Sequence, residues 1–393
     1  MKALEGIVVL DLTTAYSGPF ASMQLADHGA EVIKIENHKG GDQTRIWEPL
    51  KDGVSAYFAF VNRNKKSITL NLRSERGKEI FLELVKQADV VMENYRGGTM
   101  EKMGLGYEKL KSVNPGIIMA SLSGFGQTGP LKQQGAFASI AEALSGVMNM
   151  TGFPDGPPTA TGNSTGDSMT GAFTVIGILM ALIHRAEKGE GQYIDVAMTD
   201  TMFHAIENAA VLYSVLGEEP VRNGNRDVAG YPYDCFEAKD GYCILSVANT
   251  NDWSPFAKAI GREELIEDPR FLTNSDRKKN EDELFEIISN WTKQLNRKEI
   301  EEIFYEYGLL YAPVLKVSEV VEHEQLRGRE MIVEMEDPNL GKYIIQGVPV
   351  KMSLTPGSVD KPAPGLGEHN LEIYERIGLS PEELQELKSQ QII

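Results

Sequence analysis

The chain has 393 residues, of which 41% are hydrophobic, and its formal net charge is −18. A chain longer than about 250–300 residues exceeds the size of a single hydrophobic core, so two domains or one large interrupted domain are expected. The acidic balance argues against nucleic acid or an anionic membrane as the main partner, and an anionic ligand would need a local basic patch.

Two kinds of segment alternate along the first half of the chain. Short apolar runs typical of buried strands are separated by stretches with helical spacing. The predicted strands are residues 6–12, 30–36, 66–72, 88–95, 116–124 and 191–198, and the predicted helices are residues 19–29, 74–88, 106–113, 138–150 and 168–186. Strand, helix and strand joined by short turns imply a parallel sheet covered by helices on both faces.

The composition and the hydrophobic pattern of the sequence change after about residue 215. Turn-forming residues come first, and acidic amphipathic helices are expected over residues 251–326. Sheet-like segments resume at residues 330–336 and 341–352, so the end of the chain is expected to rejoin the first domain. The predicted division is a large α/β domain over residues 1–224, a small domain over 225–325, and a linker with a returning C-terminal segment over 326–393.

The N-terminus and the cysteines indicate a cytoplasmic protein. MKALEGIVVLDL lacks the basic start, long apolar run and cleavage site of a signal peptide, and the later run VIGILMALI is too short to span a bilayer. Cys235 and Cys243 are too few for a disulfide framework and wrongly spaced for a zinc knuckle. They could pair with each other, but a reduced protein is the expectation.

Residues 159–173, TATGNSTGDSMTGAF, set Asp167 among small and hydroxylated neighbours just before an apolar run. An aspartate in this position is usually the N-cap of a helix, and a reactive carboxylate is the alternative. The sequence contains neither a metal-binding HExxH pair nor a phosphate-binding GxxxxGK[ST] loop. Glu36, at the end of the second strand, suggests a dinucleotide site, but Gly18 is the single glycine in the turn that would approach the pyrophosphate.

The order of segments resembles the class III CoA-transferases, which include formyl-CoA and carnitine CoA-transferases and have the alpha-methylacyl-CoA racemases as relatives. The matching stretches are VLDLTTAYSGPFASMQLADHGAEVIKIE, GGDQTR, NRNKKSITLNL, ENYRGGTMEKMGLGYEKLKSVNPGIIMASLSGFGQTGP, ALSG, TGDSMTG, KGEGQYIDVAMTD, AKDGY and APGLGEHN. The resemblance implies an α/β fold with a large Rossmann-like parallel-sheet domain, formed by the N-terminal part and the C-terminal tail, and a smaller α+β domain. It also implies an interlaced homodimer.

The same resemblance implies that Asp167, in GDSMTG, is the catalytic nucleophile. Coenzyme A would be transferred from an acyl-CoA thioester to a carboxylic acid through an aspartyl-CoA intermediate, with no permanently bound cofactor and no metal. A carboxylate with an ordinary pKa near 4 is ionised at neutral pH without the help of a base. Gly162, Gly166 and Ser168 leave room beside it for an acyl group.

Further site residues follow from the resemblance. Tyr16 and Glu142 could contact the acyl group, although Glu142 could equally lie on the surface of an amphipathic helix. The expected contacts of coenzyme A are Asn37, His38, Lys39, Asn64, Lys65 and Lys66 at the nucleotide end, and Arg96 and Lys102 at the pyrophosphate. Each of these lysines could instead be a solvated surface charge. Their expected position after strand ends, where ligands bind in open α/β sheets, favours a binding role for the group.

One position separates transfer from racemisation. Racemases of the family carry a histidine that moves the proton next to the thioester, and this chain has Ala136 and Phe137 at the equivalent place. Phenylalanine cannot shuttle a proton, so transfer is favoured. A racemase and a CoA-binding homologue without activity stay open as alternatives.

Overall fold

The computed structural model describes residues 1–247 and 249–393, which divide into two compact units. The first unit comprises Met1–Met148, Ala160–Ser214 and Glu324–Ile393, and the second comprises Asn149–Thr159 and Val215–His323. The boundary predicted between residues 224 and 225 therefore differs from the structure. Residues just before it belong to the second unit because Arg222 donates to the carbonyl groups of Asn149 (3.1 Å) and Gly156 (3.0 Å).

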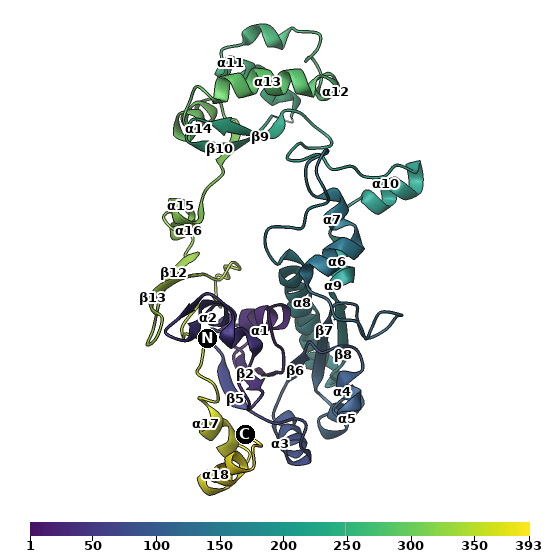
Figure 1. The fold of residues 1–393 in the computed structure, drawn as a ribbon, viewed down its shortest axis with the longest axis vertical. Helices are drawn as coiled ribbons and strands as arrows, with labels where there is room; N and C mark the ends of the chain where they lie inside the picture. The colour runs from purple at the N-terminus through teal and green to yellow at the C-terminus, as the bar shows by residue number, and fades with distance from the viewer. Residues whose placement is uncertain (248) are drawn as a thin grey trace. The chain divides into compact units, whose positions relative to one another are not determined.

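A six-stranded, wholly parallel sheet forms the centre of the first unit, which confirms the sheet predicted from the sequence (Figure 1). The strands run in the order β5-β2-β1-β6-β7-β8. Their bounds are β1 Val8–Asp11, β2 Glu31–Glu36, β5 Lys66–Thr69, β6 Val90–Glu93, β7 Ile118–Ser123 and β8 Tyr193–Ala197. Because β1 lies inside the sheet, the segment that follows it starts at the carboxyl edge between two neighbouring strands.

Apolar side chains on both faces of the sheet are buried under helices, as the near-continuous apolar strands predict. Leu10 and Ile33 belong to the core cluster on one face, which is shared with α3 (Glu75–Val85), α5 (Tyr107–Val113), α17 (Asn370–Glu375) and α18 (Pro381–Ser389). Val9 and Val32 belong to the cluster on the other face, shared with α1 (Ser17–Asp27) and α8 (Thr165–Lys188). The C-terminal helices therefore complete one face of the sheet.

The first unit contains further, smaller elements, of which α7 (Val147–Met150) and α10 (Ala209–Leu216) extend across its boundary with the second unit. Other small helices are α2 (Ala56–Val61), α4 (Thr99–Lys102), α6 (Ala138–Ser145), α9 (Met198–His204) and α16 (Glu324–Gly328), with a 3₁₀ turn η1 (Gln43–Ile46). Two antiparallel hairpins are β3 (Leu50–Lys51) with β4 (Val54–Ser55) and β12 (Ile332–Asp337) with β13 (Gly341–Gln346). The helix predicted over residues 138–150 is interrupted at Gly146, whose φ of 93° lies in the left-handed region that glycine adopts at low cost.

The second unit packs helices against a three-stranded antiparallel sheet of order β11-β10-β9. Its elements are β9 (Tyr233–Ala238), β10 (Gly241–Ser246), β11 (Leu310–Pro313), α11 (Trp253–Ala259), α12 (Asn274–Lys279), α13 (Glu281–Thr292), α14 (Arg297–Glu306), α15 (Val317–Val320), η2 (Thr250–Asp252) and η3 (Glu263–Ile266). Cys235 pairs with Ile244 and Cys243 with Phe236, and both thiols are free. Since neighbouring side chains alternate between faces, the two thiols point to opposite faces and cannot form the disulfide considered above.

Helix α8 is the central helix of the first unit and begins three residues earlier than predicted. Within the described part of the chain it is the one helix that is long and apolar enough to cross a membrane by length and composition. It also packs closely on α1: a Cβ atom at Gly171 would lie 2.8 Å from the carbonyl oxygen of Ser17 and 2.8 Å from Phe20. This approach brings the start of α8 next to the start of α1.

Candidate active site

Asp167 occupies the first turn of α8 but is not its N-cap. The N-cap is Ser164, and Asp167 is the third residue of the helix. The N-cap role that the local position of Asp167 alone suggested is therefore wrong. The side chain is half-buried and receives hydrogen bonds from the hydroxyl and the backbone N–H of Ser17. A carboxylate at this place also faces the positive end of the helix dipole.

Burial raises the pKa of Asp167 to about 6. The hydrogen bonds from Ser17 lower it, and the negative charge of Glu142 raises it further. The sequence predicted a carboxylic acid with an ordinary pKa near 4, whereas in the structure the pKa of Asp167 lies closer to neutrality. At pH 7 the carboxylate is still mostly ionised, and it has lost part of its hydration, which makes it a stronger nucleophile than a solvated one.

Tyr16 lies in the loop that follows β1, and its hydroxyl is 3.1 Å from the Ser168 Oγ. Its ring contacts the rings of Phe20, Tyr57 and Phe60, with centroid distances of 5.5, 5.8 and 6.2 Å. Burial, with the charge of Asp167 as a contributing cause, raises the pKa of Tyr16 and raises that of Tyr57 to about 12. Both phenols therefore remain protonated hydrogen-bond donors beside the carboxylate.

Glu142 is 1% exposed, so the surface position considered for it is wrong. Its two carboxylate oxygens accept hydrogen bonds from the backbone N–H (3.0 Å) and the hydroxyl (2.7 Å) of Thr161. These bonds connect α6 to the chain just ahead of α8. Glu142 thus orders the approach to Asp167 and acts on it electrostatically.

A GxSxG sequence, GNSTG at residues 162–166, lies directly before Asp167. A serine nucleophile in this motif needs a strand followed by a sharp turn into a helix. Residues 151–163 contain turns and extended chain without a strand. Ser164 therefore lacks the strand that would hold its hydroxyl in a nucleophile elbow.

A cavity of about 500 Å³ lies at the carboxyl edge of the sheet, beyond β1, β2 and β5. It brings together the predicted Asn37, His38 and Lys39, and Tyr95 lines it from the end of β6. Both ring nitrogens of His38 are buried without a hydrogen-bond partner in the described structure. Arg96, next to Tyr95, is exposed at the same edge, and Lys102 is exposed at the end of α4. The cavity can therefore receive polar groups of a ligand.

Sequence reasoning missed part of this cavity. Asn71, Leu72 and Arg73 line it and directly follow β5. The rule that ligands bind beyond the carboxyl ends of parallel strands would have found them, because they follow a strand that was predicted.

Asn64, Lys65 and Lys66 are not brought together with Asn37 to Lys39. Asn64 and Lys65 precede β5 and Lys66 is its first residue, so all three lie at its amino end, whereas the rule applied to them concerns the other edge of the sheet. Lys65 is buried, with its ammonium 3.2 Å from Asp11. The Asn64 amide bonds Asp27 and the Ser358 carbonyl, and Lys66 pairs with Glu31 and Glu372. All three polar groups already have partners.

Glu36 likewise has partners within the chain. It accepts two hydrogen bonds of 2.7 Å from the Arg45 guanidinium and one of 2.6 Å from Ser67. A ribose would have to compete with this bidentate ion pair. Among the described residues, no group of three or more histidine, cysteine, aspartate or glutamate side chains is arranged to hold a metal.

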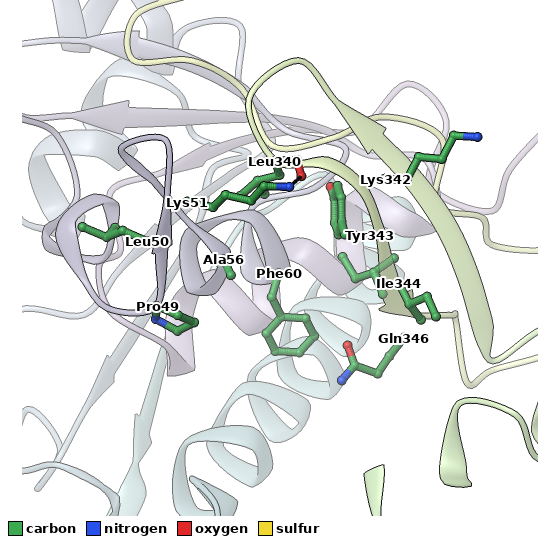
Figure 2. Close-up of a pocket in the computed structure, with 11 residues that line it drawn as sticks. Pro49, Leu50, Lys51, Ala56, Phe60, Leu340, Lys342, Tyr343, Ile344 and Gln346 are labelled. Atoms are coloured by element: carbon green, nitrogen blue, oxygen red, sulfur yellow. Dashed lines mark hydrogen bonds between the residues drawn. The ribbon is translucent and has the colours of Figure 1, made fainter. Parts of the chain in front are cut away.

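A second cavity, of about 460 Å³, lies between α2 and the β12–β13 hairpin (Figure 2). Its lining is mostly apolar and includes Pro49, Leu50, Ala56, Phe60 and Ile344. Phe60 also contacts Tyr16, but Asp167 is not part of the lining. The cavity is therefore a neighbour of the carboxylate site and not the site itself.

Comparison with known proteins identifies the family. Residues 4–370 match the family described as CoA-transferase family III. The chain is 37% identical to the succinyl-CoA–D-citramalate CoA-transferase of Chloroflexus aurantiacus, over 100% of this chain and 98% of that protein. It is 40% identical to the acetyl-CoA:oxalate CoA-transferase of Acetobacter aceti, over 93% of each chain. A solved CaiB/BaiF family protein from Brucella suis is 35% identical, with a TM-score of 0.86 over 96% of this chain and 99% of that one.

The resemblance stated from the sequence is thereby confirmed. The named relatives are transferases, so the racemase alternative is not favoured. The chain belongs to CoA-transferase family III and is a CoA-transferase.

Proposed function

We propose that this enzyme moves coenzyme A from an acyl-CoA thioester to a small carboxylic acid, with Asp167 as the nucleophile. The observation that carries the proposal is the position of this carboxylate. It is half-buried in the first turn of α8, with Ser17 donating to it and the Tyr16 and Ser168 hydroxyls beside it. The names of the relatives support the substrate classes, an acyl-CoA and a carboxylate.

In the first half of the reaction, an Asp167 oxygen attacks the thioester carbonyl carbon. The carbon–sulfur bond breaks, the CoA thiolate leaves, and a mixed anhydride of Asp167 and the acyl group remains. The thiolate then attacks the aspartyl carbonyl carbon of the anhydride. The donor leaves as a free carboxylate, and Asp167 carries coenzyme A as a thioester.

The second half reverses these steps with a new acid. The acceptor carboxylate attacks the aspartyl thioester, and the thiolate leaves and attacks the acceptor carbonyl of the resulting anhydride. Acyl-CoA is released and the Asp167 carboxylate is regenerated, so no proton, electron or metal is consumed. The Ser17 N–H and the Tyr16 and Tyr57 hydroxyls are the donors that stabilise the negative oxygen of each tetrahedral intermediate.

We place coenzyme A with its nucleotide end at the cavity beyond β1, β2 and β5. Its phosphates would meet Lys39 and Arg73 at the cavity and Arg96 next to it, three cationic side chains at the edge of an otherwise acidic protein. Lys65 is left out of this site because its ammonium is buried against Asp11.

The decisive experiment compares Asp167→Asn with Asp155→Asn, an exposed aspartate in the loop ahead of α8. A panel of succinyl-, acetyl- and formyl-CoA with mono- and dicarboxylate acceptors is assayed by mass spectrometry. Transfer is expected to fall by at least about 1000-fold in Asp167→Asn and to stay at the wild-type level in Asp155→Asn. Wild type incubated with acyl-CoA alone should carry a CoA thioester on the peptide 159–173. A label on another carboxylate would overturn the proposal, and CoA binding without any transfer would favour the inactive homologue.

A further inference from the structure

The short segment Thr13–Ser17 forms the loop after β1 and ends in the first residue of α1, and it is held by surrounding side chains. Its first three backbone N–H groups donate in succession to Asp11 (2.9 Å), Asn94 (2.9 Å) and Asp42 (3.3 Å). Backbone hydrogen bonds in loops are usually made to other backbone groups or to water. Here each amide has its own acceptor side chain.

The carbonyl groups of the same loop are bound in the same way. The Lys34 ammonium donates to the Thr13 carbonyl at 2.8 Å, and the Asn94 amide donates to the Thr14 carbonyl at 2.7 Å. Asn94 thus binds both backbone groups of Thr14. The path of the loop is determined by residues from β1, β2, the turn after β2 and the end of β6.

Two of these anchoring side chains form a buried ion pair. The Lys34 ammonium is 2.9 Å from the Asp42 carboxylate, and the two side chains are 1% and 0% exposed. Burying two charges is costly, and an apolar pair of similar volume is often as stable. A gain in stability alone therefore does not explain why the two charges are buried. Their hydrogen bonds to the backbone of Thr13 and Ala15 indicate a role in fixing the loop. Thr44 also donates to Asp42 through its N–H and its hydroxyl, which fixes the carboxylate in turn.

The loop it holds is strained and carries groups of the active site. Ala15 has a φ of 65°, a left-handed conformation that costs a non-glycine residue about 1–2 kcal/mol. The next two residues are Tyr16, which lies against Ser168, and Ser17, which donates to Asp167. A released loop would relax at Ala15 and turn both side chains away.

We propose that the buried Lys34–Asp42 ion pair is a positioning element of the active site. It holds the loop Thr13–Ser17 in the conformation that directs Tyr16 and Ser17 to Asp167. The inference rests on the proposed role of Asp167. Lys34 and Asp42 are among the residues that line the cavity beyond β1, β2 and β5, but their side chains are only 1% and 0% exposed. The alternative is that the pair contributes only to the stability of the fold.

A matched pair elsewhere in the first unit separates the two possibilities. Arg63 and Asp27 form another ion pair, 2.7 Å apart with both side chains 2% exposed, and it has no hydrogen bond to the loop. Lys34→Met and Arg63→Met each remove one buried cation and leave a buried carboxylate. Both variants should lose stability, but only Lys34→Met should change the loop.

Two measurements are made on the full-length variants. Hydrogen exchange by mass spectrometry should show that the amides of residues 13–15 exchange at least about tenfold faster in Lys34→Met and at the wild-type rate in Arg63→Met. In the transferase assay, Lys34→Met should lower kcat by about 10–100-fold and change the KM for acyl-CoA by less than about threefold. The conservative Lys34→Arg, which keeps a charged donor, should recover part of kcat.

Unchanged loop exchange in Lys34→Met, or equal changes in both variants, would overturn the inference. If Lys34→Met does not fold, the double variant Lys34→Met/Asp42→Asn, which buries no unpaired charge, is read in the same way. Loss of kcat with an unaltered loop would count against the positioning role. A wild-type enzyme without transfer activity would refute the proposed function, whereas the exchange data would still decide whether the pair fixes the loop.

Discussion

Asp167 owes its chemistry to where its side chain is buried. A solvated aspartate would be fully ionised well below neutral pH, but burial and the charge of Glu142 bring its pKa to about 6. The Ser17 donors oppose this shift and keep the carboxylate mostly ionised at pH 7. In the proposed mechanism, the carboxylate is thereby ionised and partly desolvated and needs no neighbouring base.

The pH dependence of transfer should report this pKa. Attack requires the ionised form, so kcat/KM should rise tenfold per pH unit below about pH 6 and level off above it. Glu142→Gln removes one cause of the raised pKa of Asp167, so the rising part of the pH profile should move to lower pH. The profile is measured with a saturating acceptor. A limb centred near pH 4 in wild type would contradict the burial argument.

Glu93, at the carboxyl end of β6, is a buried carboxyl group without a cation beside it. Burial raises its pKa to about 7, although the nearby Ser121 hydroxyl and the Tyr95 N–H, which donates to it at 2.7 Å, lower the value. Its unfolded-state pKa is 4.5. Because the folded-state pKa is the higher one, the stability that the protonated group contributes is complete below pH 4.5 and is lost as the pH rises through 7.

Glu93→Gln should therefore stabilise the protein in alkaline solution. The unfolding free energy of wild type should fall between pH 4.5 and 7, and the variant should exceed it by about 1–3 kcal/mol at pH 8. Denaturant titrations at pH 5 and pH 8 measure the difference, with the exposed Glu108→Gln as the control. An equal effect of Glu93→Gln at both pH values would show that the carboxyl group titrates normally.

The contact between α1 and α8 joins the two helices that carry the candidate site. Gly171 permits it, because any side chain there would meet the Ser17 carbonyl and Phe20 at 2.8 Å. The same helix contains Gly177, where a Cβ atom would lie 3.1 Å from a side-chain atom of Ile194 that can move. The two glycines of one helix thus have different packing constraints.

Gly171→Ala should push the two helices apart. We expect a loss of about 1–3 kcal/mol in unfolding free energy and a lower kcat, because Ser17 moves away from Asp167. Gly177→Ala should be neutral or stabilising by up to about 1 kcal/mol, as alanine is the better helix former. Thermal unfolding and the transferase assay test both variants. Equal behaviour of the two would show that the approach at Gly171 can be relieved without cost.

Several large hydrophobic side chains on α6 and α8 of the first unit are exposed in the described structure. Ile140 and Leu144 on α6 and Ile176, Met180 and Ile183 on α8 are exposed large hydrophobic side chains. Exposed apolar side chains of this kind are typical of an interface. The homodimer expected from the sequence would cover them.

Light scattering after size-exclusion chromatography should accordingly give about twice the 43.4 kDa chain mass. A charge placed in this surface, as in Met180→Lys, should weaken the assembly and expose a concentration-dependent loss of activity. Lys188→Met, at the polar end of α8, serves as the control. A stable monomer with full activity would refute the dimer.

Local patterns were sufficient to predict the sheet. The sheet is buried on both faces, and this burial is visible as an apolar run in the sequence of each of its six strands. Asp167 was singled out as the candidate nucleophile by the family resemblance, which the continuous stretch TGDSMTG helps to carry. The carboxyl-edge rule placed Asn37 to Lys39 at a cavity, since strand and ligand residues are neighbours in sequence.

The partners of each charged side chain could only come from tertiary structure. Lys65 was assigned to coenzyme A binding by resemblance and by its basic stretch, yet its ammonium is buried against Asp11, 54 positions away. The sequence left a surface position open for Glu142, whereas in the structure Thr161 donates hydrogen bonds to both of its carboxylate oxygens. The pKa of Asp167 depends likewise on Ser17 and Glu142, which folding brings to it. Burial and ion pairing depend on distances between segments far apart in sequence, and a local pattern does not contain those distances.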